Sequence, residues 1–308
     1  MKYRLIKAEK AHVPVARACR FLRVSQSGYF AFFSRGPSKR QRDDMVLLAH
    51  VREAFRLSHG TYGSPRMRME LKEQGLCAGR RRIARLMREN GLKGRQPRRW
   101  RCTTDSHHSF AVAPNLLERD FTASAPNEKW VADISSIWTQ EGWLYLAVVI
   151  DLYARRVVGW STGDRLHRDL AIRALNMALI RRQPSPGLIH HSDRGSQYAS
   201  WEYQKTLKAH GALISMSGKG NCYDNAAMES FFKTIKSELV WRTRFLSRRQ
   251  ANDMIGKYIE GFYNPQRRHS TLGYLRVRLE THGWVFLRSK FPPMATRIMA
   301  SETSRRAS

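Results

Sequence analysis

Residues 130–138 read Trp130-Val-Ala-Asp-Ile-Ser-Ser-Ile-Trp138, and the predicted architecture starts from this segment. β-Branched and aromatic residues dominate it, which predicts a strand with Asp133 among apolar neighbours. Glu141-Gly142 is a turn signal, and residues 143–150, apolar throughout, predict a second strand buried on both faces. Residues 155–161 predict a third strand. The stretch therefore predicts a meander of strands at the start of an α/β domain.

The chain beyond this meander alternates between helix and strand signals. Helices are predicted over 168–181, 201–210 and 224–240, and short strands over 187–191 and 212–215. Crossover connections that follow a hairpin meander predict a mixed sheet flanked by helices, which is an α/β layer fold.

Three acids on different predicted elements are candidates for one site. Asp133 lies in the first strand, and Asp193 directly follows the fourth, where sites form in open α/β sheets. Glu229 lies on the last helix, one residue from its apolar stripe, so it borders the core and can reach the sheet. Lys233 and Lys236 lie on the same border and can hold a phosphate.

Carboxylates that converge on one spot repel one another unless cations neutralise them. Mg²⁺ or Mn²⁺, hard cations that prefer oxygen ligands, are the natural partners. Two such ions, about 4 Å apart, can activate an attacking oxygen and stabilise a leaving oxygen at phosphorus. Zinc is disfavoured, because the adjacent His190 and His191 point to opposite faces of a strand. No motif indicates a covalent serine or tyrosine nucleophile.

The first hundred residues are helical in pattern. Two short helices are predicted within 13–33, with Ser25 or Ser27 as the cap of the second, and a longer helix over 42–57. Ser64 is the expected cap of the next helix, with Pro65 in its first turn.

The last predicted helix of this region, from about 78 to 90, completes a helix-turn-helix outline. Ile83, Leu86 and Met87 are spaced to face a core. Residues 64–101 hold 13 Lys or Arg against 3 Glu, which favours contact with DNA over a merely solvated basic face. The candidate DNA-binding residues on this helix are Arg80, Arg81, Arg82, Arg85 and Arg88.

The whole chain is strongly basic, with 55 Lys and Arg against 25 Asp and Glu and a formal net charge of +30. A folded protein with this charge repels itself unless its working partner is a polyanion, and nucleic acid is the first candidate. The sequence predicts no membrane span and no secretory signal. The four scattered cysteines indicate no zinc ribbon or disulfide framework. We therefore expect a reducing, intracellular setting without a membrane partner.

Three motifs resemble the integrase-core family, which comprises the DDE transposases and retroviral-type integrases of the ribonuclease H-like fold. In particular they resemble the OrfB-type transposases of bacterial insertion sequences. The motifs are Trp130-Val-Ala-Asp133, His191-Ser-Asp-Arg-Gly-Ser-Gln-Tyr198 and Gly220-Asn-Cys-Tyr-Asp-Asn-Ala-Ala-Met-Glu-Ser-Phe-Phe-Lys233. The spacing between Asp193 and Glu229 is typical of that group, and residues 263–274 resemble its closing segment. The resemblance covers roughly residues 3 to 275.

The resemblance implies a DNA transposase. Asp133, Asp193 and Glu229 would hold two Mg²⁺ ions, or Mn²⁺, while Lys233 and Lys236 approach DNA near the scissile phosphate. Water would free a 3′-hydroxyl at an element end, and that hydroxyl would attack target DNA. The implied partners are double-stranded DNA, further copies of the chain on that DNA, and a small upstream product joined by frameshift or supplied separately. The implied location is the bacterial cytoplasm, in association with the nucleoid.

The expected organisation has four parts. A helical DNA-binding region spans 1–101, with its helix-turn-helix over about 42–92, and a linker spans 102–125. The integrase-type catalytic core spans 126–275. The remainder, 276–308, is a basic tail that departs from the family pattern. The main alternative is a catalytically inert DNA-binding repressor, a decayed transposase; a plain nuclease of the same fold is a further alternative.

Overall fold

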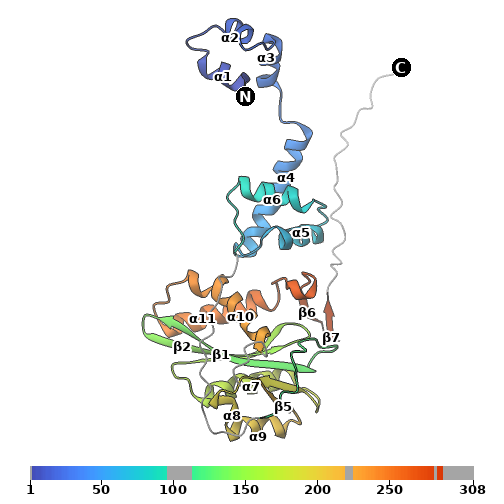
Figure 1. Cartoon of the computed structure of the whole chain (residues 1–308), viewed down its shortest axis with the longest axis vertical. Coiled ribbons are helices and arrows are strands. Elements are labelled where there is room, and N and C mark those ends of the chain that lie inside the picture. The colour runs from blue at the N-terminus through green and yellow to red at the C-terminus, as the bar shows by residue number, and fades with distance from the viewer. Residues whose placement is uncertain (1, 96–112, 219–224, 281–282, 287–308) are drawn as a thin grey trace, which may run out of the picture. The chain divides into compact units, whose positions relative to one another are not determined.

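A computed structural model describes residues 2–95, 113–218, 225–280 and 283–286 of the chain (Figure 1). It divides into two compact units, Met1–Arg52 and Glu53–Ser308. Residues 102–112 of the expected linker, the motif residues 220–224 and the tail beyond residue 286 lie outside the described residues.

The first unit begins with three short helices, α1 (Lys2–Glu9), α2 (Val15–Phe21) and α3 (Gln26–Ser34). Ile6, Cys19 and Tyr29 form their small core. Ser25 caps α3, and its Oγ accepts a hydrogen bond from the backbone N–H of Gly28 at 3.0 Å. The two predicted helices and the cap are therefore confirmed. Helix α4 (Lys39–Leu57) follows and crosses the boundary between the units.

The second unit opens with α5 (Ser64–Glu73) and α6 (Arg80–Glu89). Ile83, Leu86 and Met87 are buried, as their spacing predicts. The prediction that Ser64 caps α5 is wrong: Gly63 occupies the cap position and no side chain caps the helix. Ser64 is already helical, and Pro65, which has no N–H to satisfy, follows it in the first turn.

A five-stranded sheet forms the centre of the second unit. Its order is β3-β2-β1-β4-β5, made of β1 (Lys129–Thr139), β2 (Gly142–Asp151), β3 (Arg156–Gly163), β4 (Ile189–Ser192) and β5 (Leu213–Met216). The first three strands form the antiparallel meander, β4 runs parallel to β1, and β5 runs parallel to β4. The predicted mixed sheet is confirmed.

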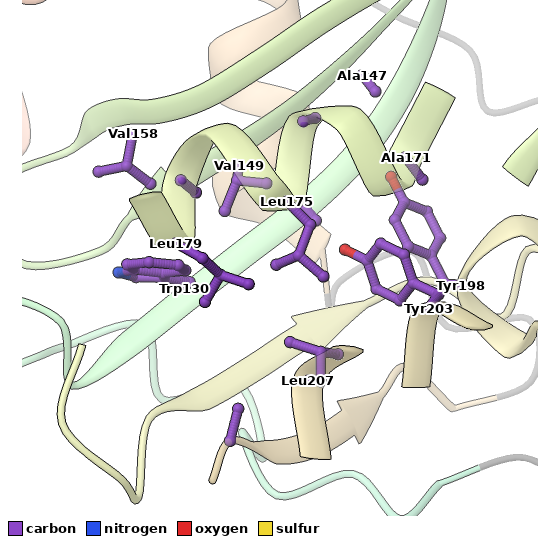
Figure 2. Close-up of a cluster of buried hydrophobic side chains, with 14 of the residues drawn as sticks. Trp130, Ala147, Val149, Val158, Ala171, Leu175, Leu179, Tyr198, Tyr203 and Leu207 are labelled. Carbon is purple, nitrogen blue, oxygen red and sulfur yellow. The ribbon is translucent and has the colours of Figure 1, made fainter. Parts of the chain in front are cut away.

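Helices cover both faces of this sheet (Figure 1). On one face lie α7 (Arg168–Arg182), α8 (Ser196–Ala199) and α9 (Trp201–Ala209), and on the other lie α10 (Ala226–Glu238) and α11 (Arg248–Tyr258). Figure 2 shows the main core, in which Trp130 of β1 and Val149 of β2 pack with Leu175 and Leu179 of α7. Gly159 of β3 lets α7 pack closely on the sheet, since a Cβ there would collide with the backbone oxygen of Ala174 and lie 2.8 Å from the backbone nitrogen of Ala178.

The chain after α10 holds structure that the sequence analysis did not predict. A 3-10 turn, Val240–Arg242, precedes α11, and a π-helical turn, Ile259–Tyr263, extends it. After a further 3-10 turn, Ser270–Leu272, the antiparallel strands β6 (Val277–Glu280) and β7 (Gly283–Phe286) lie in the region expected to be tail. None of the helices in the described part of the chain combines the length and apolar character that a membrane crossing needs.

Candidate active site

Asp133 and Asp193 come at the same level of two neighbouring strands. The parallel ladder between β1 and β4 ends at the pair Ala132 and Ser192, so Asp133, within β1, and Asp193, the first residue after β4, are the next residue on each chain segment. Residues in register on neighbouring parallel strands lie about 5 Å apart and face the same side. The sheet therefore brings both acids to the carboxyl end of β4, the edge at which open α/β sheets form sites.

Glu229 approaches from the first turn of α10. Met228, Phe231 and Ile235 are buried on this helix, which packs against β1. The side chain of Glu229 lies beside that buried face and remains 31% exposed. It occupies the boundary between core and solvent that its position beside the apolar stripe predicts.

The charges of Asp193 and Glu229 act on Asp133. Burial raises the pKa of Asp133 well above its ordinary value, and the negative charges of Asp193 and then of Glu229 raise it further. The backbone N–H of Ile134, which donates to Asp133 Oδ1 at 2.7 Å, and the charge of Lys236 act in the opposite direction but do not reverse the shift. The uncompensated repulsion at Asp133 is what a bound cation would relieve.

Asn225 belongs to this site, although the sequence analysis gave it no role. It stands at the N-terminus of α10, yet its side chain does not cap the helix. Its Nδ2 instead donates to Asp133 Oδ2 at 3.0 Å, and its Oδ1 is buried without a hydrogen-bond partner among the described residues. The available signal was its position, four residues before Glu229 in the third motif.

The two lysines differ in their surroundings. Lys233 Nζ lies 3.7 Å from Glu229 Oε2, and its side chain is 34% exposed. Lys236 is buried. Burial lowers the pKa of Lys236, and the charge of Asp133 opposes that change. One lysine thus lies at the rim of the site beside Glu229, and the other lies deeper, near Asp133.

The histidines of β4 have structural partners. His190 Nε2 lies 3.1 Å from the hydroxyl of Tyr203, and burial lowers the pKa of His190 to about 3. His191 Nδ1 lies 2.8 Å from Ser215 Oγ, and its Nε2 lies 3.2 Å from Ser217 Oγ. Both imidazoles are buried and hydrogen-bonded, so they hold β4 in place behind the acids.

The donor atoms at this site fit a hard divalent cation in kind. They are the oxygens of three carboxylates together with the buried, unpartnered Oδ1 of Asn225. As the side chains stand, no three His, Cys, Asp or Glu residues in the described ranges are arranged to hold a metal ion. The site therefore has the donor chemistry of a site for a hard cation.

The candidate DNA-binding arginines lie on α6. Arg80, Arg81 and Arg88 are exposed, whereas Arg82 and Arg85 are half-buried. Arg85 Nη1 forms an ion pair with Glu89 at 2.8 Å. Three of the five side chains are therefore exposed on the helix that the sequence analysis singled out.

The chain matches known families over most of its length. The family described as "Integrase core domain" matches residues 123–222, a second family with the same description matches residues 210–276, and an "HTH-like domain" matches residues 41–100. Solved structures resemble it more distantly. The catalytic core of HTLV-2 integrase in complex with magnesium is 16% identical with a TM-score of 0.38, and covers 49% of this chain and 95% of that one.

Curated relatives are far more similar. "Insertion element IS600 uncharacterized 31 kDa protein" of Shigella sonnei is 47% identical over 255 residues, which are 83% of this chain and 94% of that protein. "Transposase InsF for insertion sequence IS3A" of Escherichia coli (strain K12) is 43% identical over 281 residues, 89% of this chain and 96% of that protein. With an integrase core domain and relatives of this similarity over most of its length, the chain belongs to the insertion-sequence transposases of the IS3 type.

Proposed function

We propose that this transposase cuts and joins DNA with Asp133, Asp193 and Glu229 as its catalytic carboxylates, and that these bind two divalent cations, Mg²⁺ or Mn²⁺. The observation that carries the proposal is the β1–β4 ladder, whose last pair, Ala132 and Ser192, directly precedes Asp133 and Asp193, and the raised pKa of Asp133 beside Asp193 and Glu229 supports it. Holding mutually repelling carboxylates together is costly unless a cation occupies the site for part of the working cycle. Cation binding would draw the acids together and remove that cost.

The cations would activate the attacking oxygen and stabilise the leaving oxygen of an in-line displacement at phosphorus. The chain's own residues orient the reaction. Asn225 Nδ2 donates to Asp133 Oδ2, and the buried Oδ1 of Asn225 has no hydrogen-bond partner among the described residues. Lys233, at the rim beside Glu229, is the residue proposed to contact the DNA phosphate next to the scissile bond, and Lys236 offsets charge near Asp133.

Two displacements follow from this arrangement. In the first, water attacks the phosphodiester at an element end, the bond to the leaving oxygen breaks, and a 3′-hydroxyl is released. In the second, that hydroxyl attacks a target phosphodiester, so one bond forms as another breaks and no protein nucleophile is required.

We propose that double-stranded DNA, both element ends and target, is held by the helix-turn-helix region over about 42–92. The exposed Arg80, Arg81 and Arg88 of α6, with Arg82 and Arg85 beside them, supply phosphate contacts. Transposition needs two ends held together, so we expect at least two copies on DNA. A small upstream product, fused by frameshift or separate, is a further proposed partner.

The test is nicking of supercoiled DNA that carries the flanking inverted repeats, with Mg²⁺ or Mn²⁺, by wild type and by Asp193→Asn. We expect metal-dependent nicking in the wild type, joined products, and loss of both in the variant, with DNA binding within about twofold. Nicking without joining would indicate a nuclease. Tight binding with no nicking by either protein, even after the upstream product is added, would reject the proposal.

A further inference from the structure

Two adjacent arginines, Arg267 and Arg268, enter different buried clusters. They follow the π-helical turn, in a segment from Asn264 to Arg276 that links α11 to β6. The side chain of Arg267 is 6% exposed and that of Arg268 is 1% exposed. Buried guanidinium groups are costly unless they are fully paired, so their partners define what this segment holds.

Arg267 holds the C-terminal end of α10. Its Nε donates to both carboxylate oxygens of Glu238, at 3.1 and 2.9 Å, and its Nη2 donates to Oε1 at 2.7 Å. The hydroxyl of Tyr258 on α11 donates to Glu238 Oε2 at 2.7 Å. Burial alone would lower the pKa of Arg267, but the charge and hydrogen bonds of Glu238 raise it instead, so the pair remains ionised.

Arg268 holds α5 instead. Its Nε donates to Glu70 Oε2 at 2.9 Å, and it also pairs with Glu73. Arg276 Nη2 pairs with Glu70 Oε1 at 2.5 Å. Burial alone would raise the pKa of Glu70, yet the hydrogen bond from Arg276 and the charges of both arginines hold it below its ordinary value.

Tyr62, just before α5, adds a second connection between α5 and the same segment. Its hydroxyl accepts a hydrogen bond from the backbone N–H of Arg268 at 3.0 Å and donates to the carbonyl oxygen of Gln266 at 3.1 Å. Arg66 Nε donates to the carbonyl oxygen of Arg268 at 3.1 Å. Charged and neutral hydrogen bonds therefore fix the backbone of this segment against the helix-turn-helix-like region.

A bidentate arginine–carboxylate pair fixes orientation as well as distance, because both groups are planar. Glu238 ends the helix on which Glu229 lies, nine residues or about 14 Å earlier. The segment thus holds the helix of a candidate metal ligand on one side and a helix of the HTH-like domain on the other.

We propose that Arg267 and Arg268 are positioning residues that set the distance between bound DNA and the active site. The HTH-like helices would bind the element end. The contacts of Arg267 with Glu238 and of Arg268 and Tyr62 with the α5 side, here called the brace, would then place one particular phosphodiester at Asp133, Asp193 and Glu229. The inference rests on the proposed function, since it requires DNA on both regions. The specific consequence concerns the position of the cut. Loosening the contact of Arg267 with Glu238, or that of Arg268 with α5, lets neighbouring phosphodiesters be cut as well, while cleavage itself continues.

The experiment maps cleavage positions at single-nucleotide resolution on end-labelled DNA that carries the inverted repeats. The variants are Arg268→Met, which fills the buried site without charge, Tyr62→Phe, which removes one hydroxyl, and Arg267→Lys, which keeps the charge but loses the bidentate geometry. Arg181→Gln is the matched control, because it breaks a surface ion pair, with Glu260, that contacts neither α5 nor α10.

We expect wild type and Arg181→Gln to cut at one position. The three brace variants should spread their cuts over neighbouring phosphodiesters, with repeat binding within about twofold. Single-position cutting by the folded variants would overturn the inference, and Tyr62→Phe decides it if the arginine variants do not fold. Failure of the proposed function would look different. The wild type would then not nick DNA, or Asp193→Asn would nick it equally well.

Discussion

His190 and His269 are buried imidazoles whose protonation opposes folding. Burial, mainly, lowers the pKa of each to about 3, whereas an unfolded histidine titrates near 6.5. Between these values the unfolded chain binds protons that the folded chain excludes, so stability is full above pH 6.5 and falls as pH decreases toward 3. From pH 6 to pH 5 we expect a loss of about 1 kcal/mol for each histidine.

Urea unfolding at pH 7, 6 and 5 measures this loss. His269→Phe, which keeps a ring of similar size against Tyr263, should reduce the pH dependence by the share that His269 contributes, although its stability at pH 7 can differ. The comparison is between the slopes of the unfolding free energy against pH for the two proteins, not between their free energies at one pH. An unchanged pH dependence of the unfolding free energy would mean that His269 is already protonated in the folded state, contrary to its lowered pKa.

At the level of single helices, Ser25 and Ser64 form a matched pair. The sequence predicts that each caps a helix. Ser25 precedes α3 and accepts a hydrogen bond from its first turn, whereas Ser64 is the first residue of α5 and no side chain caps that helix. Ser25→Ala should destabilise α3 by about 1 kcal/mol, and Ser64→Ala should have an effect near zero, because alanine is a better helix former. Amide hydrogen exchange measures the protection of α3 and of α5 separately within each variant.

We expect protection of the α3 amides to fall about fivefold in Ser25→Ala, the factor that corresponds to 1 kcal/mol. Protection of the α5 amides should be unchanged in Ser64→Ala. An equal loss in both variants would show that the local hydrogen bond is not what distinguishes the two helix starts.

The elements of the catalytic domain were predictable because their patterns are local. Alternation, turn signals and helical period identified β1 to β5, α7, α9 and α10, and the order of the elements identified the sheet. Helix α11 was missed: its buried residues, Ala251, Ile255 and Tyr258, form a thin stripe in an otherwise polar, basic sequence. A segment with so narrow an apolar stripe is helical because it packs on β2. The sequence alone does not reveal that contact.

The candidate site was predictable to the same extent. Register and strand ends account for the meeting of Asp133 and Asp193, and helical spacing accounts for the border position of Glu229. The roles of Asn225 and of the pair formed by Glu238 and Arg267 were not predicted. Each depends on a contact between residues far apart in the chain, and a single long-range pair leaves no periodic signal.

On the scale of the whole molecule, the formal net charge of +30 makes salt the sharpest probe of DNA binding. Each phosphate that a basic side chain neutralises releases counterions, so the binding constant falls as a power of salt concentration. If Arg81 and Arg88 contact phosphates, replacing both with Gln should reduce the slope of log K against log salt by about 2, or about 1 for each residue.

The control is Arg181→Gln, which removes one charge from an exposed arginine on α7 and is compared with the change in slope for each residue of the α6 variant. A general effect of net charge would lower the slope for every arginine removed, whereas a specific interface lowers it only for those that meet phosphates. We therefore expect the control to keep the wild-type slope of log K against log salt in fluorescence anisotropy titrations over roughly 50 to 300 mM salt. Equal slopes for α6 and α7 variants would mean that α6 does not lie on DNA and that binding depends on the overall field of the protein.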